Sequence, residues 1–342
     1  MKVAKYYSQK EIRYEDAPVP HIGFEEVLVK MNACGVCGSD LMDWYLTDRA
    51  PLILGHEPAG VIVEAGADVK NFKEGDHVFV HHHVPCLTCH YCVRGAYTMC
   101  DQYRRTHIDP GGFAEYFRVP APNLQIDTLK LPDNLSFEEA TLIEPTACCI
   151  KALKKCNIRQ GDTAVVVGAG PSGIIHTMLL QTLGVGRIIV SEPIEYRLKA
   201  AERLGADVVI NPAKEDFCEV VMEETGGRGG DVVIVTAPSL RAISSGFEVC
   251  SRGGTLCIFA PTSPTEYFPL SPNRIFFSEI TVVSSYSTSH LETRTALKLI
   301  DAKRIKAREL ITHRFPLHET GKAFKVAIKE KESLKIIING EN

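Results

Sequence analysis

One stretch decides the fold of this chain: Thr163-Ala164-Val165-Val166-Val167-Gly168-Ala169-Gly170-Pro171-Ser172-Gly173. Its apolar first half predicts a buried β-strand, and its glycines follow the spacing Gly-x-Gly-x-x-Gly. The segment after it, residues 174–183, is typical of a helix, and Glu192 closes the next apolar run nineteen residues beyond Gly173. A strand, a glycine-rich turn, a helix and a later acidic residue together predict a βαβ unit that binds a dinucleotide.

The glycine-rich turn has a physical reason for each of its positions. Gly168 permits the tight turn, Gly170 lets the backbone approach a pyrophosphate, and Gly173 permits close packing of helix on strand. A helix that begins at Pro171 and Ser172 directs its first N–H groups and its dipole toward the phosphates. These five residues are therefore predicted to bind the cofactor.

Glu192 decides which dinucleotide is expected. Its carboxylate would accept hydrogen bonds from the adenosine ribose and would repel a 2′-phosphate, which favours NAD over NADP. An acidic side chain at a strand end is also common without any ligand, and Arg197 nearby could meet a phosphate. We predict NAD as the cofactor, with Glu192 and Arg197 in its site.

The same alternation of apolar strand and helix continues along the chain and predicts a doubly wound parallel sheet, an α/β fold. Further strands are expected at residues 187–190, 208–210, 232–235 and 255–259, and a helix at 196–204.

The sequence before this region follows a different pattern. Short β-like runs at residues 26–30, 60–64 and 76–80 are broken by Gly, Pro and Asp, which is the pattern of a small β-barrel. A last strand is expected within residues 333–338. With 342 residues the chain should form two domains. We place the β domain at residues 1–145 and 295–342, and the dinucleotide-binding domain at 146–294.

Four cysteines, Cys86, Cys89, Cys92 and Cys100, stand with two, two and seven residues between them. Four thiolates at this spacing can close a tetrahedron around Zn²⁺ and leave no position for substrate, so residues 86–100 predict a structural zinc site. A disulfide cluster, a redox pair and an iron–sulfur cluster are the alternatives. The chain begins without an apolar secretory segment, so we expect a reducing, cytoplasmic location, which disfavours disulfides.

A second metal site is predicted from three separated loops. Cys37, His56 with Glu57, and Glu144 supply soft, borderline and hard ligands, as catalytic zinc sites usually do. Each residue also has a plain alternative: a buried thiol, a hydrogen-bonded histidine, or a carboxylate at a helix N-terminus. We expect two zinc ions per chain, one structural and one catalytic.

Charge and composition exclude some kinds of partner. The formal net charge is −4, and no basic stripe is present, which makes nucleic acid or an anionic membrane surface an unexpected partner. No apolar run approaches the roughly 20 residues of a membrane helix. A small-molecule substrate is expected instead.

At these motifs the chain resembles the zinc-dependent medium-chain dehydrogenase family, in its sorbitol and threonine dehydrogenase branch, over essentially its whole length. The motifs that carry the resemblance are Gly35-Val36-Cys37-Gly38-Ser39-Asp40, Gly55-His56-Glu57, the four cysteines, Gly112-Phe113-Ala114-Glu115-Tyr116, Glu144-Pro145 and the glycine-rich turn. The resemblance implies a GroES-like catalytic domain beside the Rossmann domain. It makes Cys37 and His56 zinc ligands, with Glu57 a ligand in some states. Glu144 replaces a second cysteine and points to the polyol branch.

The resemblance also implies a reaction. A hydride would pass from the carbon of a secondary alcohol to the nicotinamide, with zinc as the Lewis acid and Ser39 as a proton relay. Relatives continue this relay to a histidine five residues after the cysteine ligand, where this chain has Met42. A thioether carries no proton, so Asp43, a water chain or a neighbouring histidine would have to replace it.

The expected substrate pocket is polar. His82 stands four residues before Cys86, where the family places a pocket residue, and Trp44, Tyr45 and His107 are weaker candidates. Such a pocket suits a polyol or sugar derivative better than an aliphatic alcohol, with oxidation of an amino alcohol such as L-threonine as the alternative.

The sequence leaves two alternative functions open and predicts a homo-oligomer. A non-catalytic protein that binds NAD and zinc is the rival of another class, and a zinc-free quinone reductase is the other. The family favours a homodimer or homotetramer, for which the apolar run at residues 280–283 offers a strand edge.

Overall fold

The computed structural model describes residues 1–340 and divides the chain into two units. Unit 1 comprises Met1–Ala147 and Thr288–Asn342, and unit 2 comprises Cys148–Ser287. The chain returns from unit 2 to unit 1 at Thr288, just before helix α12 (His290–Asp301), whereas we expected this return at residue 295. The hydroxyl of Ser289 caps this helix by accepting a hydrogen bond from the Leu291 N–H at 3.3 Å, so the helix is one continuous element that a crossing at 295 would divide.

Unit 2 contains a six-stranded sheet in which every neighbouring pair is parallel. Its strands are β9 (Thr163–Val167), β10 (Arg187–Ser191), β11 (Val208–Ile210), β12 (Gly230–Val235), β13 (Cys250–Ile258) and β14 (Thr281–Ser284). Their order in the sheet is β11-β10-β9-β12-β13-β14, which confirms the predicted doubly wound fold. Because the order reverses beside β9, the loop after β9 lies where such sheets bind ligands.

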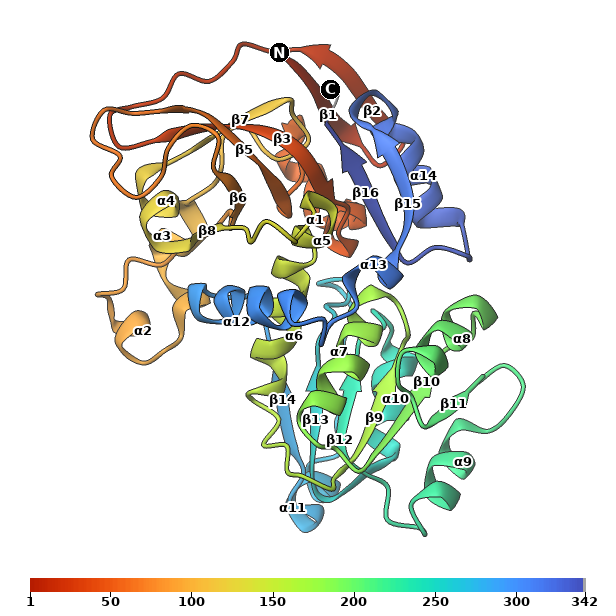
Figure 1. Ribbon diagram of the computed structural model, residues 1–342. Coiled ribbons are helices and arrows are strands. Elements are labelled where there is room, and N and C mark those ends of the chain that lie inside the picture. Colours follow the sequence, from red (N-terminus) through yellow and green to blue (C-terminus); the bar gives the residue numbers. More distant parts are fainter. Residues whose placement is uncertain (341–342) are drawn as a thin grey trace. The chain divides into compact units, whose positions relative to one another are not determined.

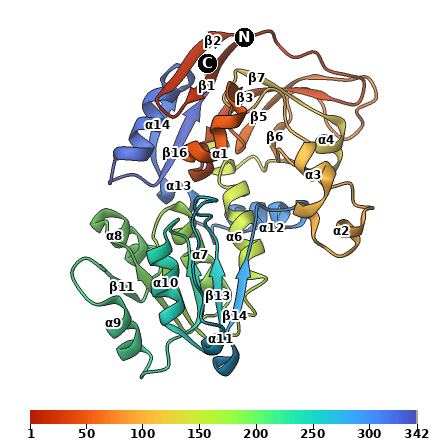
Figure 2. The same cartoon turned by 180° about the vertical axis from the view of Figure 1, so that it is seen from behind.

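Helices cover both faces of this sheet, as Figures 1 and 2 show: α7 lies in front of the strands in the first view and α10 in the second. The helices of unit 2 are α7 (Pro171–Thr182), α8 (Glu195–Arg203), α9 (Phe217–Glu224), α10 (Leu240–Glu248) and α11 (Pro272–Ser278). Central strands such as β9 are buried along their whole length, which explains their unbroken apolar runs.

Strand β13 begins five residues before the predicted start at 255. Gly230 pairs with Cys250, and the ladder then shifts register before Val232 pairs with Thr255. The intervening Ser-Arg-Gly-Gly reads as a turn in sequence, and Gly253 does adopt a positive φ of 73°. The bulge keeps these residues in the strand, which local sequence did not reveal.

Unit 1 is built on a sheet of the order β15-β16-β3-β5-β6-β8, with β7 also paired to β3. Its strands are β3 (Val27–Gly35), β5 (Pro58–Ala65), β6 (His77–Val80), β7 (Tyr116–Val119), β8 (Thr128–Lys130), β15 (Ile311–Pro316) and β16 (Lys335–Asn339). A smaller sheet joins β1 (Lys2–Ser8), β2 (Glu11–Asp16) and β4 (Leu52–Ile53). The predicted β domain is confirmed.

The last strand returns to the first part of the chain. Strand β16 pairs antiparallel with β3, with Ile337 opposite Gly35, and Figure 1 shows the blue C-terminal elements beside the red N-terminal strands. This pairing places Lys335 next to the end of β3, close to the predicted metal ligand Cys37.

Helices in unit 1 are short apart from three. The α-helices are α1 (Asp43–Leu46), α2 (His90–Val93), α3 (Asp101–Arg105), α4 (Ala121–Asp127), α5 (Phe137–Ala140), α6 (Ile143–Leu153), α12, α13 (Ala307–Leu310) and α14 (Thr320–Lys329), and α6 continues into unit 2. The 3₁₀ turns are η1 (Gly38–Leu41), η2 (Thr47–Arg49), η3 (Tyr97–Met99) and η4 (Leu317–Glu319). Across residues 1–340, no helix combines the length and apolar character that crossing a membrane requires.

Candidate metal centres and cofactor loop

The four cysteines of the lobe, residues 86–100, come together around one point. Cys89 caps α2 and Cys100 ends η3, and the four sulfur atoms all lie within 4.8 Å of one another. The Sγ of Cys92 is 3.9 Å from that of Cys86 and 3.6 Å from that of Cys89. A tetrahedron with Zn–S bonds of about 2.3 Å has edges of about 3.8 Å, so this geometry fits zinc. These separations are too long for disulfide bonds, which measure about 2 Å.

Backbone N–H groups support the four sulfur atoms. The Cys89 N–H donates to Cys86 Sγ, and the Cys86 N–H donates to Cys100 Sγ, both at 3.4 Å. Hydrogen bonds from Thr88 lower the pKa of Cys86 to about 6, whereas burial raises the pKa of Cys92 to about 12. A bound cation is the group that would stabilise all four as thiolates.

The second cluster joins the loops after β3 and before β5. Cys37 precedes η1, His56 and Glu57 precede β5, and one ligand atom of each lies within 4.8 Å of the others. The turn before His56 requires Gly55, which has a φ of 91° and whose missing Cβ would lie 2.7 Å from the Phe113 N. The sequence-predicted residues Cys37, His56 and Glu57 are therefore brought together.

Asp40 contacts two of these predicted ligands, Cys37 and His56. One oxygen of its buried carboxylate accepts the Cys37 N–H at 3.0 Å, and the other is 3.3 Å from His56 Nδ1. This contact leaves His56 Nε2 available as a ligand. Burial alone would lower the pKa of His56, but the nearby Asp40 and Cys37 raise it well above its usual value. The surroundings thus favour a positive charge, which is what a metal would supply.

Lys335 is the counter-ion of Glu57. Its ammonium group bonds Glu57 Oε2 and also donates to the Val36 carbonyl at 3.0 Å, and both side chains are buried. A Cβ on Gly35 would lie 1.9 Å from Glu57 Oε2, so glycine is needed for this pair to form. Although burial would lower the pKa of Lys335, Glu57 raises it. Glu57 Oε1 has no protein partner within residues 1–340, which leaves this oxygen available to coordinate a metal ion.

Glu144 and Ser39 lie outside the group of three ligand atoms. Glu144 is buried in the first turn of α6, and its charge reaches Glu57 and Lys335, but it is not among the ligand atoms within 4.8 Å. Ser39 lies half-buried in η1, two residues from Cys37.

A row of imidazoles extends from the second cluster. The ring centroid of His82 is 5.0 Å from that of His56 and 4.0 Å from that of His83, which is 4.5 Å from that of His107. Burial lowers the pKa of His82 well below its usual value and that of His83 to about 3, so both rings are neutral. Of the predicted pocket residues, His82 lies beside the cluster and His107 lies at the exposed end of the row.

The aromatic candidates on α1 face other partners. Trp44 is about half exposed, and its ring centroid lies 5.9 Å from that of Tyr45. The carboxylate of Asp43 accepts a hydrogen bond from the Tyr6 hydroxyl at 3.0 Å, so it is already engaged within the β domain.

In unit 2 the glycine-rich turn has the geometry expected of each position. Gly168 has a φ of 106°, and a Cβ on Gly173 would lie 1.9 Å from the Gly168 carbonyl oxygen. Gly170 caps α7, which begins at Pro171, and nothing lies within 4 Å of its missing Cβ. Protein atoms therefore fill the space beside Gly168 and Gly173, whereas the space beside Gly170 is free for a ligand.

Glu192 lies at the end of β10, buried, beside this turn. Its Oε2 accepts the Ala169 N–H at 2.8 Å, and its Oε1 accepts the Ile194 N–H at 3.0 Å. The carboxylate thus fixes the turn, and each oxygen keeps a second lone pair for a ligand hydroxyl. Arg197 is half-buried on α8.

Sequence reasoning missed two residues of the second cluster. Asp40 stood within a quoted motif without a role, and Lys335 was included only in an apolar strand. A signal existed for Lys335: a lone charge inside the run Leu334–Ile338 needs a buried partner.

Comparison with known proteins agrees with this geometry. Residues 23–133 match the alcohol dehydrogenase GroES-like domain, and residues 171–302 match the zinc-binding dehydrogenase family. Sorbitol dehydrogenase of Bacillus subtilis is 34% identical over 99% of this chain and 97% of its own length. L-threonine 3-dehydrogenase of Pyrococcus furiosus is 34% identical over 88% of this chain and 87% of its own. The crystal structure of 2R,3R-butanediol dehydrogenase from Bacillus subtilis has a TM-score of 0.87 at 29% identity, with 99% of each chain covered.

The fold and the two clusters define a dehydrogenase with a Rossmann domain and zinc-binding loops. The chain belongs to the zinc-dependent medium-chain dehydrogenase family, in its polyol and threonine dehydrogenase branch. It is an oxidoreductase that acts on alcohols with zinc and a nicotinamide dinucleotide, so the predicted family, fold, enzyme class and cofactor classes are confirmed.

Proposed function

We propose that this enzyme oxidises a secondary alcohol group of a polyol or sugar derivative and transfers the hydride to NAD. The observation that carries the proposal is the cluster of Cys37, His56 and Glu57, fixed from outside by Asp40 and Lys335. The relative named sorbitol dehydrogenase supports a polyol substrate. The neutral His82 ring beside the cluster supports a polar pocket.

In this proposal each metal has its own residues. Cys37, His56 and Glu57 hold the catalytic zinc, and Glu144, whose charge acts on Glu57, is the proposed fourth residue of the site. The four lobe cysteines hold the structural zinc. When bound at the cluster of Cys37, His56 and Glu57, zinc would supply Lewis acidity to the alcohol oxygen and lower its pKa.

The chain's own groups orient the site and move the proton. Asp40 holds the His56 ring by Nδ1, and Lys335 offsets the charge of Glu57 so that two anionic side chains can share a buried site. Ser39 is the proposed first carrier of the alcohol proton. Met42 ends that relay, and Asp43 is engaged by Tyr6, so the onward path is assigned to water or to a histidine of the row.

The preference for NAD is assigned to Glu192, with Gly168, Gly170 and Gly173 at the pyrophosphate and Arg197 nearby. Glu192→Ala should lower the ratio of kcat/KM for NAD⁺ over that for NADP⁺, because the repulsion of a 2′-phosphate is lost. Asp216→Ala, which removes an N-cap carboxylate on α9, is the control for a general effect on unit 2. An unchanged ratio would remove Glu192 from the specificity assignment.

The test of the proposed function is NAD⁺ reduction by the zinc-replete protein across polyols, sugars, L-threonine and simple secondary alcohols, with bound zinc counted in the same preparation. Turnover of a polyol with about two zinc ions per chain supports the proposal. Preference for L-threonine would favour the second candidate, which the Pyrococcus furiosus relative suggests. Zinc confined to the lobe, with no turnover, would favour the non-catalytic alternative.

We also propose unit 1 as the catalytic domain and unit 2 as the NAD-binding domain, in a cytoplasmic homodimer or homotetramer. Strand β14 lies at the edge of its sheet, and Phe276 and Phe277 on the preceding helix are about three-quarters exposed. A paired copy would cover both. Light scattering of the purified protein would test the assembly.

A further inference from the structure

The row of imidazoles that leaves the metal cluster ends beside an arginine. From the cluster outward the row consists of His56, His82, His83 and His107, whose successive ring centroids are 5.0, 4.0 and 4.5 Å apart. Partial burial and the positive charge of Arg49 both lower the pKa of His107. Arg49 therefore lies near the outer end of the row.

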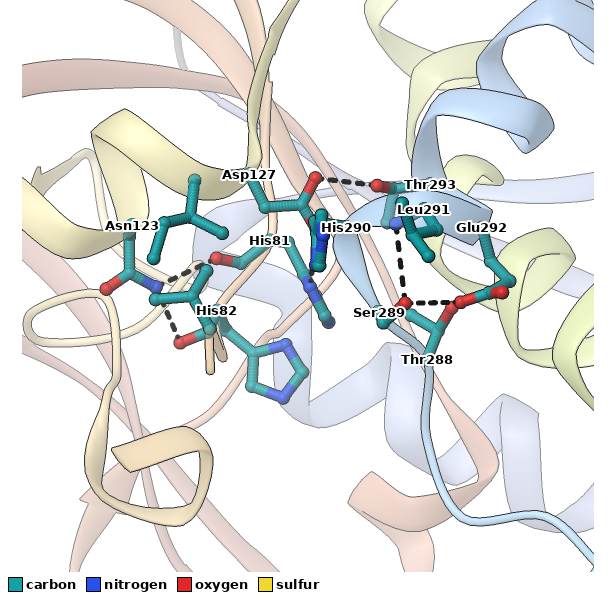
Figure 3. A network of polar contacts seen from close by, with 12 residues as sticks. His81, His82, Asn123, Asp127, Thr288, Ser289, His290, Leu291, Glu292 and Thr293 are labelled. Carbon is teal, nitrogen blue, oxygen red and sulfur yellow. Dashed lines mark hydrogen bonds and ion pairs between the residues drawn. The ribbon is translucent and has the colours of Figure 1, made fainter. Parts of the chain in front are cut away.

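The inner end of the row is held firmly by its neighbours. Figure 3 shows the side-chain amide of Asn123 donating to the carbonyls of both His81 and His82, each at 3.0 Å. Asp127, which is fully buried, holds the ring of His81 with its Oδ2 2.8 Å from Nδ1. The backbone from which the row projects is thus fixed before any ligand binds.

Arg49 itself is oriented by an aromatic ring and not by an acid. It ends η2, and its guanidinium carbon lies 4.2 Å from the ring centroid of Tyr45. Within residues 1–340 it forms no ion pair with a carboxylate, although Asp48 is its neighbour in the chain. A guanidinium that stacks on an aromatic face keeps the N–H groups along its edge free, and these match the oxygens of a phosphate or a carboxylate.

The segments around the outer end of the row carry an excess of positive charge. Residues 44–50, 81–84 and 103–107 contain three arginines and four histidines but one carboxylate, that of Asp48. Two of the arginines, Arg104 and Arg105, are exposed on α3 just before His107. Charges of one sign gathered in this way attract an anionic ligand.

The place of Arg49 determines which part of a substrate it can meet. Two rings, His82 and His83, lie between the metal-cluster residue His56 and His107. A substrate whose carbinol is held at the cluster can therefore reach Arg49 only with the end of its chain that is remote from the reacting carbon. The carboxylate of L-threonine is too close to its carbinol to do so.

We propose that Arg49 binds an anionic group at the remote end of the substrate, so that the enzyme acts on a polyol with a terminal phosphate or carboxylate in preference to a neutral polyol. The chemistry common to both groups is a set of anionic oxygens that a guanidinium binds with two parallel hydrogen bonds. This inference rests on the proposed alcohol oxidation at the cluster of Cys37, His56 and Glu57.

The first test measures binding without turnover. The zinc-loaded enzyme saturated with NADH cannot oxidise an alcohol, so calorimetric titration with sorbitol, sorbitol 6-phosphate and gluconate reports affinity alone. One of the two anions should bind about tenfold or more tightly than sorbitol, and the one preferred identifies the anionic group. Equal affinity for all three ligands would overturn the inference.

The second test removes the charge of Arg49. Arg49→Gln should reduce the preference for the anionic polyol about fivefold or more and leave the affinity for sorbitol within about twofold of the parent value. The matched control is Arg304→Gln, which removes the same charge from an exposed residue between α12 and α13, away from the row. It should keep the preference of the parent. An unchanged preference in Arg49→Gln, or an equal fall in both variants, would refute the role of Arg49.

Turnover then separates this inference from the proposed function. In NAD⁺ reduction by the parent enzyme, kcat/KM should be at least tenfold higher for the preferred anionic polyol than for sorbitol. Efficient oxidation of sorbitol with none of either anionic polyol would overturn the inference and leave the proposed function standing. Tight binding of an anionic polyol without oxidation of any alcohol would refute the proposed function instead.

Discussion

Two glycines of the cofactor turn should respond to alanine in opposite ways. At Gly173 the new Cβ would lie 1.9 Å from the Gly168 carbonyl oxygen, where an ordinary contact is at least 3.4 Å. Backbone must move to accept it, at a cost of about 1–3 kcal/mol or more. At Gly170 nothing lies within 4 Å of the Cβ, and the φ of −66° is one that alanine adopts readily.

Gly170→Ala should therefore leave the folded state unstrained and gain about 0.4–1 kcal/mol from a stiffer unfolded chain. That gain corresponds to a rise in the thermal midpoint of roughly 2–4 °C or less. The same methyl group takes the space through which a pyrophosphate reaches the backbone. NAD⁺ affinity should fall at least tenfold, which is about 1.4 kcal/mol.

Calorimetric titration with NAD⁺ and thermal unfolding without it separate the two effects. Gly173→Ala should lower the midpoint in the absence of cofactor, and Gly170→Ala should not. If Gly170→Ala bound NAD⁺ as tightly as the parent protein, the pyrophosphate would not approach the turn at Gly170, and the reasoning from the open Cβ position would fail.

Three further predictions concern the cysteine ligands, the ion pair of Lys335 and a buried histidine. Cys37→Ser should abolish turnover and reduce bound zinc from about two to about one per chain with the fold retained, whereas Cys92→Ser should chiefly lower the thermal midpoint; full activity in Cys37→Ser would exclude it as a ligand. Lys335→Met should destabilise the protein by about 3–5 kcal/mol, because it strands the Glu57 carboxylate without its counter-ion. The double variant with Glu57→Gln should cost less than Lys335→Met alone, and a larger loss would contradict the ion-pair account. Burial lowers the pKa of His176 to about 4. The unfolded state therefore takes up its proton first as the pH falls, and stability is lost between about pH 6.5 and 4, by about 3 kcal/mol in all. His176→Gln should flatten the thermal midpoint over this interval, and an equally steep profile would remove His176 as the cause.

The elements that sequence predicted well are those whose causes are local. The run Thr163–Val167 and the glycines after it carry strand, turn and helix signals within a few residues, and the structure has β9 and α7 there. The four lobe cysteines likewise signal a shared metal by their short spacing.

The contacts that sequence could not predict join residues that lie far apart along the chain. Glu57 and Lys335 are separated by 278 positions and meet because β16 pairs with β3. Glu192 was predicted from its position, but its hydrogen bond to the Ala169 N–H depends on the orientation of a side chain that spacing does not encode. Asp127 carried no motif, and its buried contact with His81 is visible only in the structure.

Charge balance at the second cluster explains why these partners matter. When Cys37 binds as a thiolate, it joins the carboxylates of Asp40, Glu57 and Glu144, and Lys335 offsets only one of these negative charges. Uncompensated charges in a buried site are costly, and a divalent cation offsets two of them. The raised pKa of His56 indicates the alternative, in which a proton is taken up when the metal leaves. Zinc binding should therefore release protons near neutral pH, and the release should be smaller in Asp40→Asn, because the carboxylate that favours the protonated His56 ring is gone. Calorimetric titration of the metal-free second site in buffers of different ionisation enthalpy measures this release directly, and identical values for the parent and Asp40→Asn would show that Asp40 does not control the proton on His56.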